Sequence, residues 1–376
     1  MRTAHVRPRV GVDFHSVDGI FQGIRSHVLG LYAEAIALAP EIDFVFALAD
    51  PARLLAERPE FEAANARFAV MPHAGGIARL GWQLAAFQRR ERLDLLHTQF
   101  RLPLVPLGPC ACTVHDTLFE SHPDYFDPGF RRMARWTGRR AVLQAQLLFS
   151  VSEFSRREMG RLYGVDAERI AVTPNGVDVA RFFPGEAGSD VVRALGLVPG
   201  GYLCTVGRLE PRKNHLALVR AYARLPQPRP PLVIVGQRDF SFSAVFDVVR
   251  DLGLEADVRF LERVEDDALP ALVRHAMLFV YPSFAEGFGM PVVEAMASGV
   301  AVVTSDSTSL PEVAGDAALT VDPADVAALA NAMQRLIEAP VERAALAQRG
   351  IARAARFNWR DSAATLVQAY RTHLRR

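Results

Sequence analysis

The sequence has 376 residues, half of them hydrophobic, and a formal net charge of +1. This length favours two domains over one, and the balanced charge excludes a global basic field, so we expect no nucleic-acid partner. The three cysteines are too few and too unevenly spaced for a disulfide framework or a zinc site, which is typical of a reducing cytoplasm.

The sequence indicates neither a leader nor a membrane span. Its N-terminal stretch lacks the apolar core of a signal peptide, and no run approaches the ~18 apolar residues of a membrane-spanning helix. We therefore expect a cytoplasmic protein that is soluble or lies peripherally on the inner face of the plasma membrane.

The basic residues are almost all arginine: of 43, only Lys213 is lysine. In such a composition a single Lys indicates a site that needs a compact ammonium in place of the planar fork of Arg. Chance placement is the alternative, and the motif around Lys213 decides between the two.

The first element in chain order is a strand over residues 9–14 (RVGVDF), followed by a glycine-containing loop that leads into an amphipathic helix. Gly19 and Gly23 would let the backbone approach a ligand closely. Because the dinucleotide-binding pattern G-x-G-x-x-G is absent, a plain tight turn is the alternative to a binding loop.

Short apolar runs then alternate with helical stretches: IDFVFAL, ARFAV, DLLHTQ, CACTVHD and LLFSVS. This alternation predicts a doubly wound parallel sheet, in which ligands bind beyond the carboxyl ends of the strands. His115 directly follows one such strand, which makes it a candidate site residue. A structural, hydrogen-bonded histidine is the alternative.

The stretch over residues 130–149 combines basic and aromatic side chains. At helical spacing, one face carries Arg131, Arg135 and Arg139, with Arg132 and Trp136 beside them. A helix of this kind suits anionic lipid headgroups, so an anionic membrane surface is a candidate partner. A merely solvated charged face is the alternative.

The best linker candidate is the Pro- and Gly-containing stretch at residues 183–200. It follows a first domain over residues 1–182 and precedes a second alternation of strands and helices over residues 201–357. Residues 358–376 close the chain as an amphipathic helix. The sequence thus predicts an α/β protein with two Rossmann-like halves.

The second half opens with a strand and the loop TVGRLEPRKNH, in which Arg208 and Lys213 are five residues apart. Asn214 is a candidate N-cap of the helix that follows. A guanidinium that binds as a fork and an ammonium that binds as a point charge together suit a diphosphate. An incidental basic loop is the alternative, but the position of the single Lys favours an anion site.

Residues 284–299 read FAEGFGMPVVEAMASG and follow the apolar run MLFVYPS. Pro291 suits the first position of a helix and Gly299 the position just past its end, which predicts a strand, a turn and a helix. The amides at such a helix start bind anions. Glu286 and Glu294 would repel a phosphate here unless they bind neutral sugar or ribose hydroxyls. A simple turn with a solvated glutamate is the alternative.

Taken together, VGRLEPRKN, YPSFAEGFGMPVVEAMASG, TVHDTLFE and PNGVD resemble the motifs of glycosyltransferase family 4. The resemblance covers nearly the whole chain, and Glu286 and Glu294 match the family's E-x7-E motif. It implies a retaining enzyme with the GT-B fold, in which two Rossmann-like domains face a central cleft and the C-terminal helix returns to the first domain. The segments HTQFRLPL, HDTLFESHPDYF and EGFGMP are most similar to sequences of bacterial mannosyltransferases of O-antigen and exopolysaccharide assembly.

The resemblance also implies roles for individual positions. Arg208 and Lys213 hold the donor diphosphate, Glu294 binds the ribose, Glu286 binds the hexose, and His115 contacts the sugar from the first domain. The other positions implied in donor binding are Gly19 and Gly23 at the phosphates, Val264 near the base, and Gly287, Phe288, Gly289 and Met290 through their backbone. The candidate catalytic residues are therefore His115, Arg208, Lys213 and Glu286.

The implied reaction moves a hexosyl group to a hydroxyl of a growing, lipid-linked glycan of a surface polysaccharide. The first candidate for this group is mannosyl from GDP-mannose. No metal or other cofactor is expected, because fixed protein cations can stabilise the leaving diphosphate. The alternatives are UDP-glucose or another UDP-hexose as donor, another GT-B activity such as a phosphorylase or an epimerase, and a catalytically silent sugar-nucleotide-binding protein.

Overall fold

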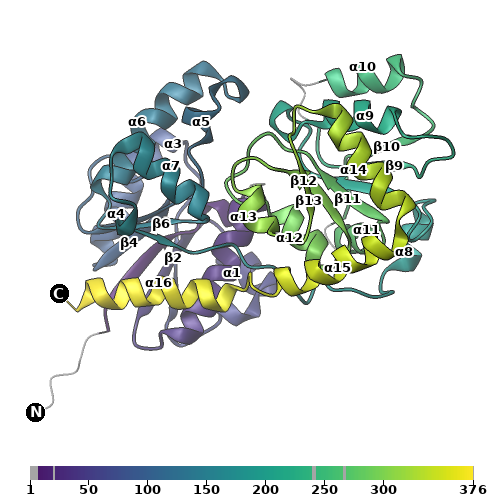
Figure 1. Cartoon of the computed structure of the whole chain (residues 1–376). Helices are drawn as coiled ribbons and strands as arrows, with labels where there is room; N and C mark the ends of the chain where they lie inside the picture. The colour runs from purple at the N-terminus through teal and green to yellow at the C-terminus, as the bar shows by residue number, and fades with distance from the viewer. Residues whose placement is uncertain (1–6, 20–21, 239–242, 266–267, 376) are drawn as a thin grey trace, which may run out of the picture. The chain divides into compact units, whose positions relative to one another are not determined.

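A computed structural model describes residues 7–19, 22–238, 243–265 and 268–375. The chain divides into two compact units. Unit 1 comprises Met1–Gly176 together with Asn358–Arg376, and unit 2 comprises Val177–Phe357. Each unit is a parallel sheet covered by helices (Figure 1), which confirms the predicted fold class.

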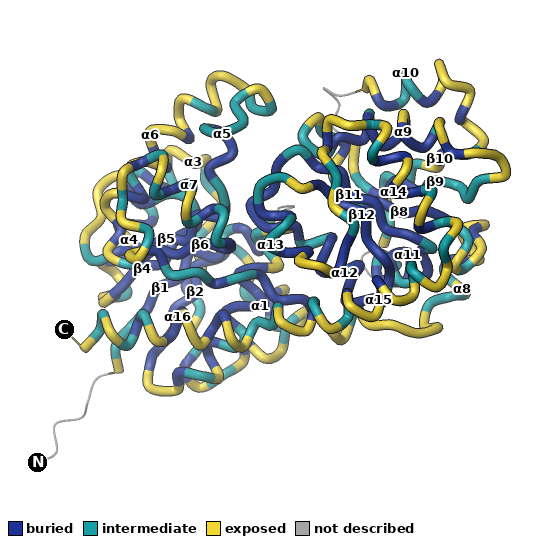
Figure 2. The backbone as a smooth tube through the Cα atoms, in the orientation of Figure 1, coloured by how far each residue is buried: buried dark blue, intermediate teal, exposed yellow. Residues whose placement is uncertain are grey.

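Unit 1 is built on a seven-stranded parallel sheet in the order β3-β2-β1-β4-β5-β6-β7. Its strands are β1 Arg9–Asp13, β2 Asp43–Leu48, β3 Ala66–Val70, β4 Leu95–Gln99, β5 Cys110–Val114, β6 Leu147–Ser150 and β7 Ile170–Val172. All residues of β2, β4 and β5 are buried, as expected for strands with helices on both faces (Figure 2). The predicted alternation of apolar runs thus corresponds to the strands.

The main helices of unit 1 are α1 Gln22–Leu38, α2 Pro51–Glu57, α4 Leu84–Arg90, α6 Pro128–Gln144, α7 Glu153–Tyr163 and α16 Trp359–Leu374. Helix α16 comes from the end of the chain and packs along α1 (Figure 1). The Tyr370 hydroxyl is within 2.8 Å of the Tyr32 hydroxyl, and both rings are fully buried. The returning C-terminal helix is therefore part of the core of unit 1.

Unit 2 is built on a six-stranded parallel sheet in the order β10-β9-β8-β11-β12-β13. Its strands are β8 Leu203–Val206, β9 Leu232–Val235, β10 Val258–Leu261, β11 Leu278–Tyr281, β12 Val302–Ser305 and β13 Leu319–Val321. Its helices are α8 Ser189–Ala194, α9 His215–Ala223, α10 Ala244–Asp251, α11 Leu269–Arg274, α12 Met290–Ala297, α13 Leu310–Ala314, α14 Val326–Glu338 and α15 Pro340–Ala354. The switch in strand order falls between β8 and β11, which is where ligands bind in sheets of this kind.

The predicted linker, residues 183–200, is instead an integral part of unit 2. It contains α8, which packs against α11. The Arg274 guanidinium donates hydrogen bonds to the carbonyls of Phe183 and Ala187, at 2.6 and 2.8 Å, and lies 3.9 Å from the centre of the Phe183 ring. Proline and glycine mark irregular backbone, but irregular backbone can be held firmly by one arginine. The unit boundaries fall at Gly176–Val177 and at Phe357–Asn358.

Candidate active site

The loops at the carboxyl edge of the unit 2 sheet bring Lys213 and Glu286 into direct contact. The Lys213 Nζ lies 2.7 Å from Glu286 Oε1. Lys213 ends a short 3-10 helix, Pro211–Lys213, after β8, and Glu286 lies in the loop between β11 and α12. The two motifs that the sequence places about 70 residues apart therefore form one site, because β8 and β11 are neighbours in the sheet.

Asn214 fixes the position of the Lys213 loop. It occupies the N-cap position of α9, as predicted, but its backbone is left-handed with φ +57° and its side chain does not cap the helix. Its Nδ2 instead donates to the carbonyls of Pro282 and Pro323, at 3.0 and 2.7 Å. One amide thus ties the cation loop to the ends of β11 and β13.

Glu286 is almost saturated by protein donors. Its Oε1 accepts hydrogen bonds from Lys213 Nζ, from the Tyr281 hydroxyl at 2.9 Å and from the Ser283 hydroxyl at 2.6 Å. Its Oε2 lies 2.9 Å from Arg212 Nη1. Since each carboxylate oxygen has two lone pairs, Oε2 is the atom with room for a sugar hydroxyl.

The charges of this network hold Glu286 ionised. Burial alone would raise the pKa of Glu286, but the charges of Arg212 and Lys213 outweigh it and lower that pKa to about 2. Burial also lowers the pKa of Lys213, and the Glu286 carboxylate opposes that effect. Lys213 Nζ uses two of its three donors on Glu286 and Tyr281, so one N–H is left for a ligand.

Arg212, Tyr281 and Ser283 are site residues that the sequence reasoning did not select. Arg212 also pairs with Glu210, at 2.6 Å, and its side chain is only 18% exposed. The sequence does offer a signal for Arg212, which directly precedes the single lysine. It offers none for Tyr281 and Ser283, because a strand that ends in YPS is typical of an ordinary buried strand.

A row of hydroxyl groups after β12 fixes the backbone of the glutamate loop. Ser309 Oγ lies 2.8 and 2.9 Å from the carbonyl oxygens of Glu286 and Phe288, either of which can accept its single hydrogen. The Glu286 amide donates to Thr308 Oγ1 at 3.0 Å. Thr308 itself has φ +56°, which is costly for a β-branched residue and indicates that the surrounding contacts hold it there.

Helix α12 begins at Met290, as the Pro291 signal predicted, and Gly299 follows its end with φ +74°. Gly289 precedes the helix with φ +111°, a conformation that other residues rarely adopt. Gly287 and Phe288 are buried in the turn, and Glu294 is half-buried one turn into the helix. The strand–turn–helix arrangement of residues 284–299 is thus present.

In the described part of unit 2, the remaining predicted donor residues form no hydrogen bond or ion pair with Lys213 or Glu286. Arg208 is in the same loop as Lys213 but has an exposed side chain. Val264 is half-exposed in the loop after β10, on the far side of β9 and β8 from β11. Glu262, in the same loop, pairs with Arg238 at 2.9 Å.

In unit 1, His115 lies at the carboxyl end of β5 and is only 8% exposed. Its Nε2 is 2.8 Å from Gln99 Oε1, its ring stacks on Phe100 with centroids 5.0 Å apart, and the His27 ring meets it edge-on at 4.7 Å. Burial and the neighbouring histidines hold the pKa of His115 well below its usual value, so the ring is neutral near pH 7. Within the described residues, His27 Nε2 and Gln99 Nε2 are buried without a hydrogen-bond partner.

The predicted glycine loop lies only partly within the described residues. Gly19 is in a bend after a 3-10 turn, and residues 20–21 lie outside the described ranges. Gly23 is at the start of α1, and an added Cβ there would meet no atom within 4 Å. No described residue therefore fills the space next to Gly23.

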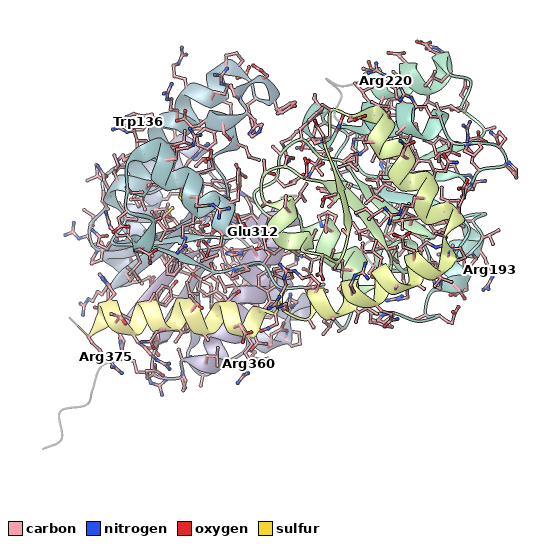
Figure 3. The ribbon with its side chains drawn as sticks, in the orientation of Figure 1. Trp136, Arg193, Arg220, Glu312, Arg360 and Arg375 are labelled. Atoms are coloured by element: carbon pink, nitrogen blue, oxygen red, sulfur yellow. The ribbon has the colours of Figure 1, made fainter. Side chains whose placement is uncertain are left out.

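The basic and aromatic stretch forms helix α6, which ends at Gln144, and residues 147–150 belong to β6. The Trp136 side chain is 59% exposed and projects from the helix (Figure 3). Arg135 lies 3.2 Å from Glu120 with a side chain that is 73% exposed. Among the described helices, none combines the length and hydrophobicity that crossing a membrane requires.

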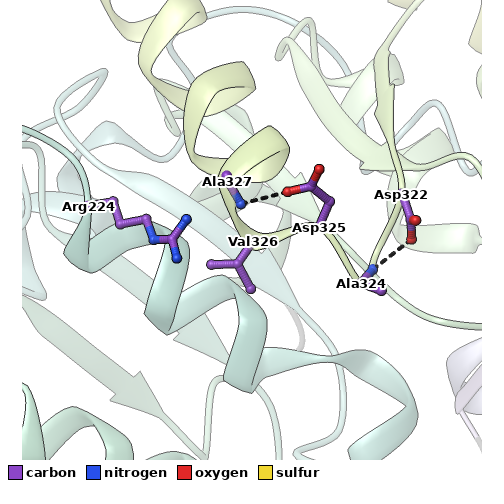
Figure 4. A pocket seen from close by; sticks show the side chains of 6 residues that line it. All are labelled: Arg224, Asp322, Ala324, Asp325, Val326 and Ala327. Carbon is purple, nitrogen blue, oxygen red and sulfur yellow. Dashed lines mark hydrogen bonds between the residues drawn. The ribbon is translucent and has the colours of Figure 1, made fainter.

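A shallow pocket of unit 2 lies at the start of α14 and does not include the predicted site residues. It is lined by Arg224, Asp322, Ala324, Asp325, Val326 and Ala327 (Figure 4). Asp325 caps α14 by accepting from the Ala327 amide at 2.9 Å, and Asp322 accepts from the Ala324 amide at 2.8 Å. Both carboxylates thus serve the local backbone. No cluster of metal-binding side chains occurs within the described parts of the chain.

Two Rossmann-like units with a cation–carboxylate site at a strand-to-helix edge define a glycosyltransferase of the GT-B class. Residues 199–353 match the family model described as glycosyl transferases group 1, and residues 21–181 match the one described as glycosyltransferase family 4. The chain is 36% identical over 270 residues to O-antigen chain mannosyltransferase B of Escherichia coli, covering 70% of this chain and 71% of that protein. The chain therefore belongs to this glycosyltransferase family and is an enzyme of that kind.

Other relatives carry different acceptors in their names, and the solved structures support the fold. The chain is 30% identical over 288 residues to D-inositol 3-phosphate glycosyltransferase of Nocardia farcinica, covering 73% of this chain and 62% of that one. Sucrose-phosphate synthase of Thermosynechococcus elongatus superposes with a TM-score of 0.76 at 22% identity, over 97% of this chain and 99% of that chain. HepE of Anabaena, solved with UDP and glucose, superposes with a TM-score of 0.76 at 21% identity, over 97% of this chain and 100% of that chain.

Proposed function

We propose that this enzyme transfers a mannosyl group from GDP-mannose to a hydroxyl of a growing, lipid-linked glycan in O-antigen or other surface polysaccharide synthesis, with retention of configuration. The single observation that carries the proposal is the 36% identity to the Escherichia coli O-antigen mannosyltransferase. The alignment with that protein covers 70% of this chain, whereas each family model lies within one half of it.

In this proposal the free donor of Lys213 and the exposed Arg208 bind the donor diphosphate. Charge develops on the diphosphate as the sugar departs, and fixed cations stabilise that charge without reorganising. Glu286 then accepts a hexose hydroxyl through Oε2, because Oε1 is already filled by three protein donors. The backbone of Gly287, Phe288, Gly289 and Met290 lies at the helix start beside the sugar, and Glu294 binds the ribose.

Retention follows if the acceptor hydroxyl attacks from the side on which the diphosphate leaves, and a departing phosphate oxygen takes its proton. Glu286 is unsuited to proton transfer, since its pKa of about 2 keeps it ionised. The neutral His115 offers a ring nitrogen to the sugar from unit 1. No step in this scheme requires a metal ion.

The experiment that tests the proposal is a donor screen followed by product analysis. Thermal unfolding is measured with GDP, UDP, ADP and their sugars, because a specific ligand stabilises the folded state by mass action. Proton NMR of the transfer product then reports the anomeric configuration. Stabilisation by GDP-mannose with an α-linked product supports the proposal; stabilisation by a UDP-hexose alone replaces the donor, and an inverted product rejects retention.

A catalytically silent binding protein gives a different result in the same screen. It would bind a sugar nucleotide tightly but release no nucleoside diphosphate with any free or lipid-linked acceptor. The intact network of Lys213, Glu286 and Arg212 favours the enzyme, because a decayed site has no use for three paired charges that are costly to bury.

We also propose that α6 contacts an anionic membrane surface through Arg131, Arg132, Arg135, Trp136 and Arg139. Phe130 and Met133 are 40% and 44% exposed on the same helix, so apolar and basic groups are both available to lipid. The wild-type protein should sediment with anionic liposomes, and a variant with Arg131, Arg135 and Arg139 changed to Glu should not. Equal sedimentation of the two proteins would contradict membrane contact.

A further inference from the structure

A second charged cluster lies at the carboxyl edge of the unit 1 sheet, outside the site described above. Asp13 ends β1 and is only 1% exposed. The Arg79 guanidinium donates to Asp13 Oδ2, and His15 Nδ1 lies 3.0 Å from Asp13 Oδ1. The side chains of Arg79 and His15 are 13% and 28% exposed, so the cluster reaches the surface through its basic members.

Arg101 adds a second guanidinium at the neighbouring strand. It follows β4, which pairs with β1 in the sheet. Its side chain forms no hydrogen bond or ion pair with any residue that the structure describes; its contact is with the Phe130 ring, 5.9 Å away. Burial and the charge of Arg79 both lower the pKa of Arg101.

The backbone holds Arg101 in this position. Phe100 has φ +60°, which is costly for an aromatic residue, and its amide is tied to the Thr113 carbonyl at 2.8 Å. The Leu104 amide donates to the Leu80 carbonyl at 2.7 Å, which joins the Arg101 loop to the residue after Arg79. The backbone thus joins two segments: the one that carries Arg79, which pairs with Asp13 at the end of β1, and the one that carries Arg101, which follows the neighbouring strand β4.

Among the described residues of unit 1, the cluster therefore has an excess of positive charge. Arg79 and Arg101 carry two charges, and Asp13 supplies one. No undescribed residue of unit 1 has an acidic side chain, so none of those can be the missing partner. A partly desolvated cation is costly without a counter-ion, and guanidiniums bind phosphate oxygens as forks.

We propose that Arg79 and Arg101 form an anion site for a phosphate or diphosphate group of the acceptor. This inference rests on the proposed function, since it adds a feature to the acceptor of that reaction. Leu104, Val105 and Leu107 follow in the same loop and are 37%, 62% and 54% exposed. An acceptor diphosphate that carries a lipid would place apolar chain beside them, whereas a free sugar phosphate would not use them.

The test is a calorimetric titration of the full chain with farnesyl diphosphate, inorganic pyrophosphate and farnesol. A saturating nucleoside diphosphate from the donor screen keeps the unit 2 cations occupied; if none binds, the Arg208→Gln variant serves as background. Arg101→Gln should weaken binding of both anions about tenfold to a hundredfold, the loss expected for a charge-assisted hydrogen bond. Arg89→Gln, which removes an exposed cation from α4 of the same unit, should change binding less than about twofold.

The probes separate the two sources of the phosphate group. Tighter binding of farnesyl diphosphate than of pyrophosphate, with no binding of farnesol, supports a lipid-linked acceptor; equal binding of the two anions supports a free phosphate ester. Identical binding by wild type and Arg101→Gln overturns the site. If the donor screen rejects GDP-mannose while Arg101→Gln still loses anion binding, the proposed donor is wrong and this site stands.

Discussion

The carboxyl edges of the two sheets have opposite electrostatic designs around their candidate residues. In unit 2, Glu286 is surrounded by Lys213 and Arg212 and every one of these groups is charged and paired. In unit 1, His115 is a neutral ring that stacks on Phe100 and meets the His27 ring edge-on. Among the described residues, two buried nitrogens beside it, His27 Nε2 and Gln99 Nε2, have no hydrogen-bond partner. The difference indicates that unit 2 is built to stabilise charge and that the His115 region is built to shape and hydrogen-bond an uncharged group.

The largest effect is expected from Lys213→Ala, which removes the donor left free for the diphosphate. Turnover should fall by about two to three orders of magnitude, because stabilisation of the developing charge is lost where it forms. Steady-state kinetics with the donor identified by screening measures this. Arg220→Ala, which removes an exposed cation on α9 of the same unit (Figure 3), is the control. Turnover of Lys213→Ala within a few-fold of wild type would exclude Lys213 from the phosphate site.

Arg212→Gln is expected to lower turnover about tenfold through Glu286. Without the Arg212 charge, the pKa of Glu286 rises from its low value of about 2, and Oε2 loses its partner. The acidic limb of the pH–turnover profile should therefore move to higher pH, and Arg212→Lys should restore part of the rate. A purely structural role would lower the amount of folded protein without moving that limb.

The two motifs of unit 2 that carry Lys213 and Glu286 could be recognised from sequence because the groups of each motif are local. Arg208 and Lys213 lie in one loop, Glu286 and Glu294 in one loop-helix unit, and the strand before each is a plain apolar run. The parallel sheet then needs only neighbouring strands to bring the two loops together. What the sequence could not give is the number of donors on Glu286, because Tyr281 and Ser283 belong to a strand end whose geometry is set by packing.

The carboxyl edge of the unit 1 sheet was harder to predict, because its side chains are positioned by contacts between residues far apart in the sequence. His115 was found by its position after a strand, but its partners come from α1 and β4, far away along the chain. The structure places the predicted linker within unit 2, where Arg274 binds the carbonyls of residues 181, 183 and 187, a contact that composition does not show. Long-range contacts made by single side chains leave no periodic pattern in a sequence.

Glu294→Ala should raise the donor Michaelis constant about tenfold while changing turnover less. A carboxylate that binds ribose hydroxyls holds ground state and transition state alike, so its loss appears mainly in binding. The measurement is donor-dependent kinetics together with calorimetry of the nucleoside diphosphate. Unchanged affinity for that nucleoside diphosphate would contradict the ribose role.

Acid should affect unit 1 before unit 2. Burial lowers the pKa of His27 to about 4 and that of His97 to about 3, and holds the pKa of His115 well below its usual value. The unfolded chain binds protons below about pH 6.5 while these folded groups stay neutral, so stability falls as pH decreases from 6.5 toward the folded pKa values. At about pH 5.5 each such histidine lowers the free energy of unfolding by about 1.4 kcal/mol relative to its value above pH 6.5.

Unit 2 has fewer groups of this kind, which makes the comparison measurable. Among its described residues, His215 alone has a histidine pKa lowered in this way, to about 3. The depressed pKa of Glu286 contributes stability that is lost only between about pH 4.5 and 2. Amide protection factors, which correct for the intrinsic pH dependence of hydrogen exchange, should therefore fall more in the core strands of unit 1 than in those of unit 2 between about pH 7.5 and pH 5.5. An equal fall in both sheets would show that these histidines become charged without unfolding.

The smallest effect is expected at Thr308, whose hydroxyl accepts the Glu286 amide. Thr308→Ala keeps the positive φ but removes that acceptor, so turnover should fall about threefold, in line with the net worth of one neutral hydrogen bond. Thr308→Ser keeps the hydroxyl and should match wild type, while Thr308→Gly relieves the backbone cost and should raise the melting temperature relative to Thr308→Ala. If Ala and Ser variants have equal turnover, the Thr308 hydroxyl does not position Glu286, and the other contacts of the loop, such as those of Ser307 and Ser309, hold it.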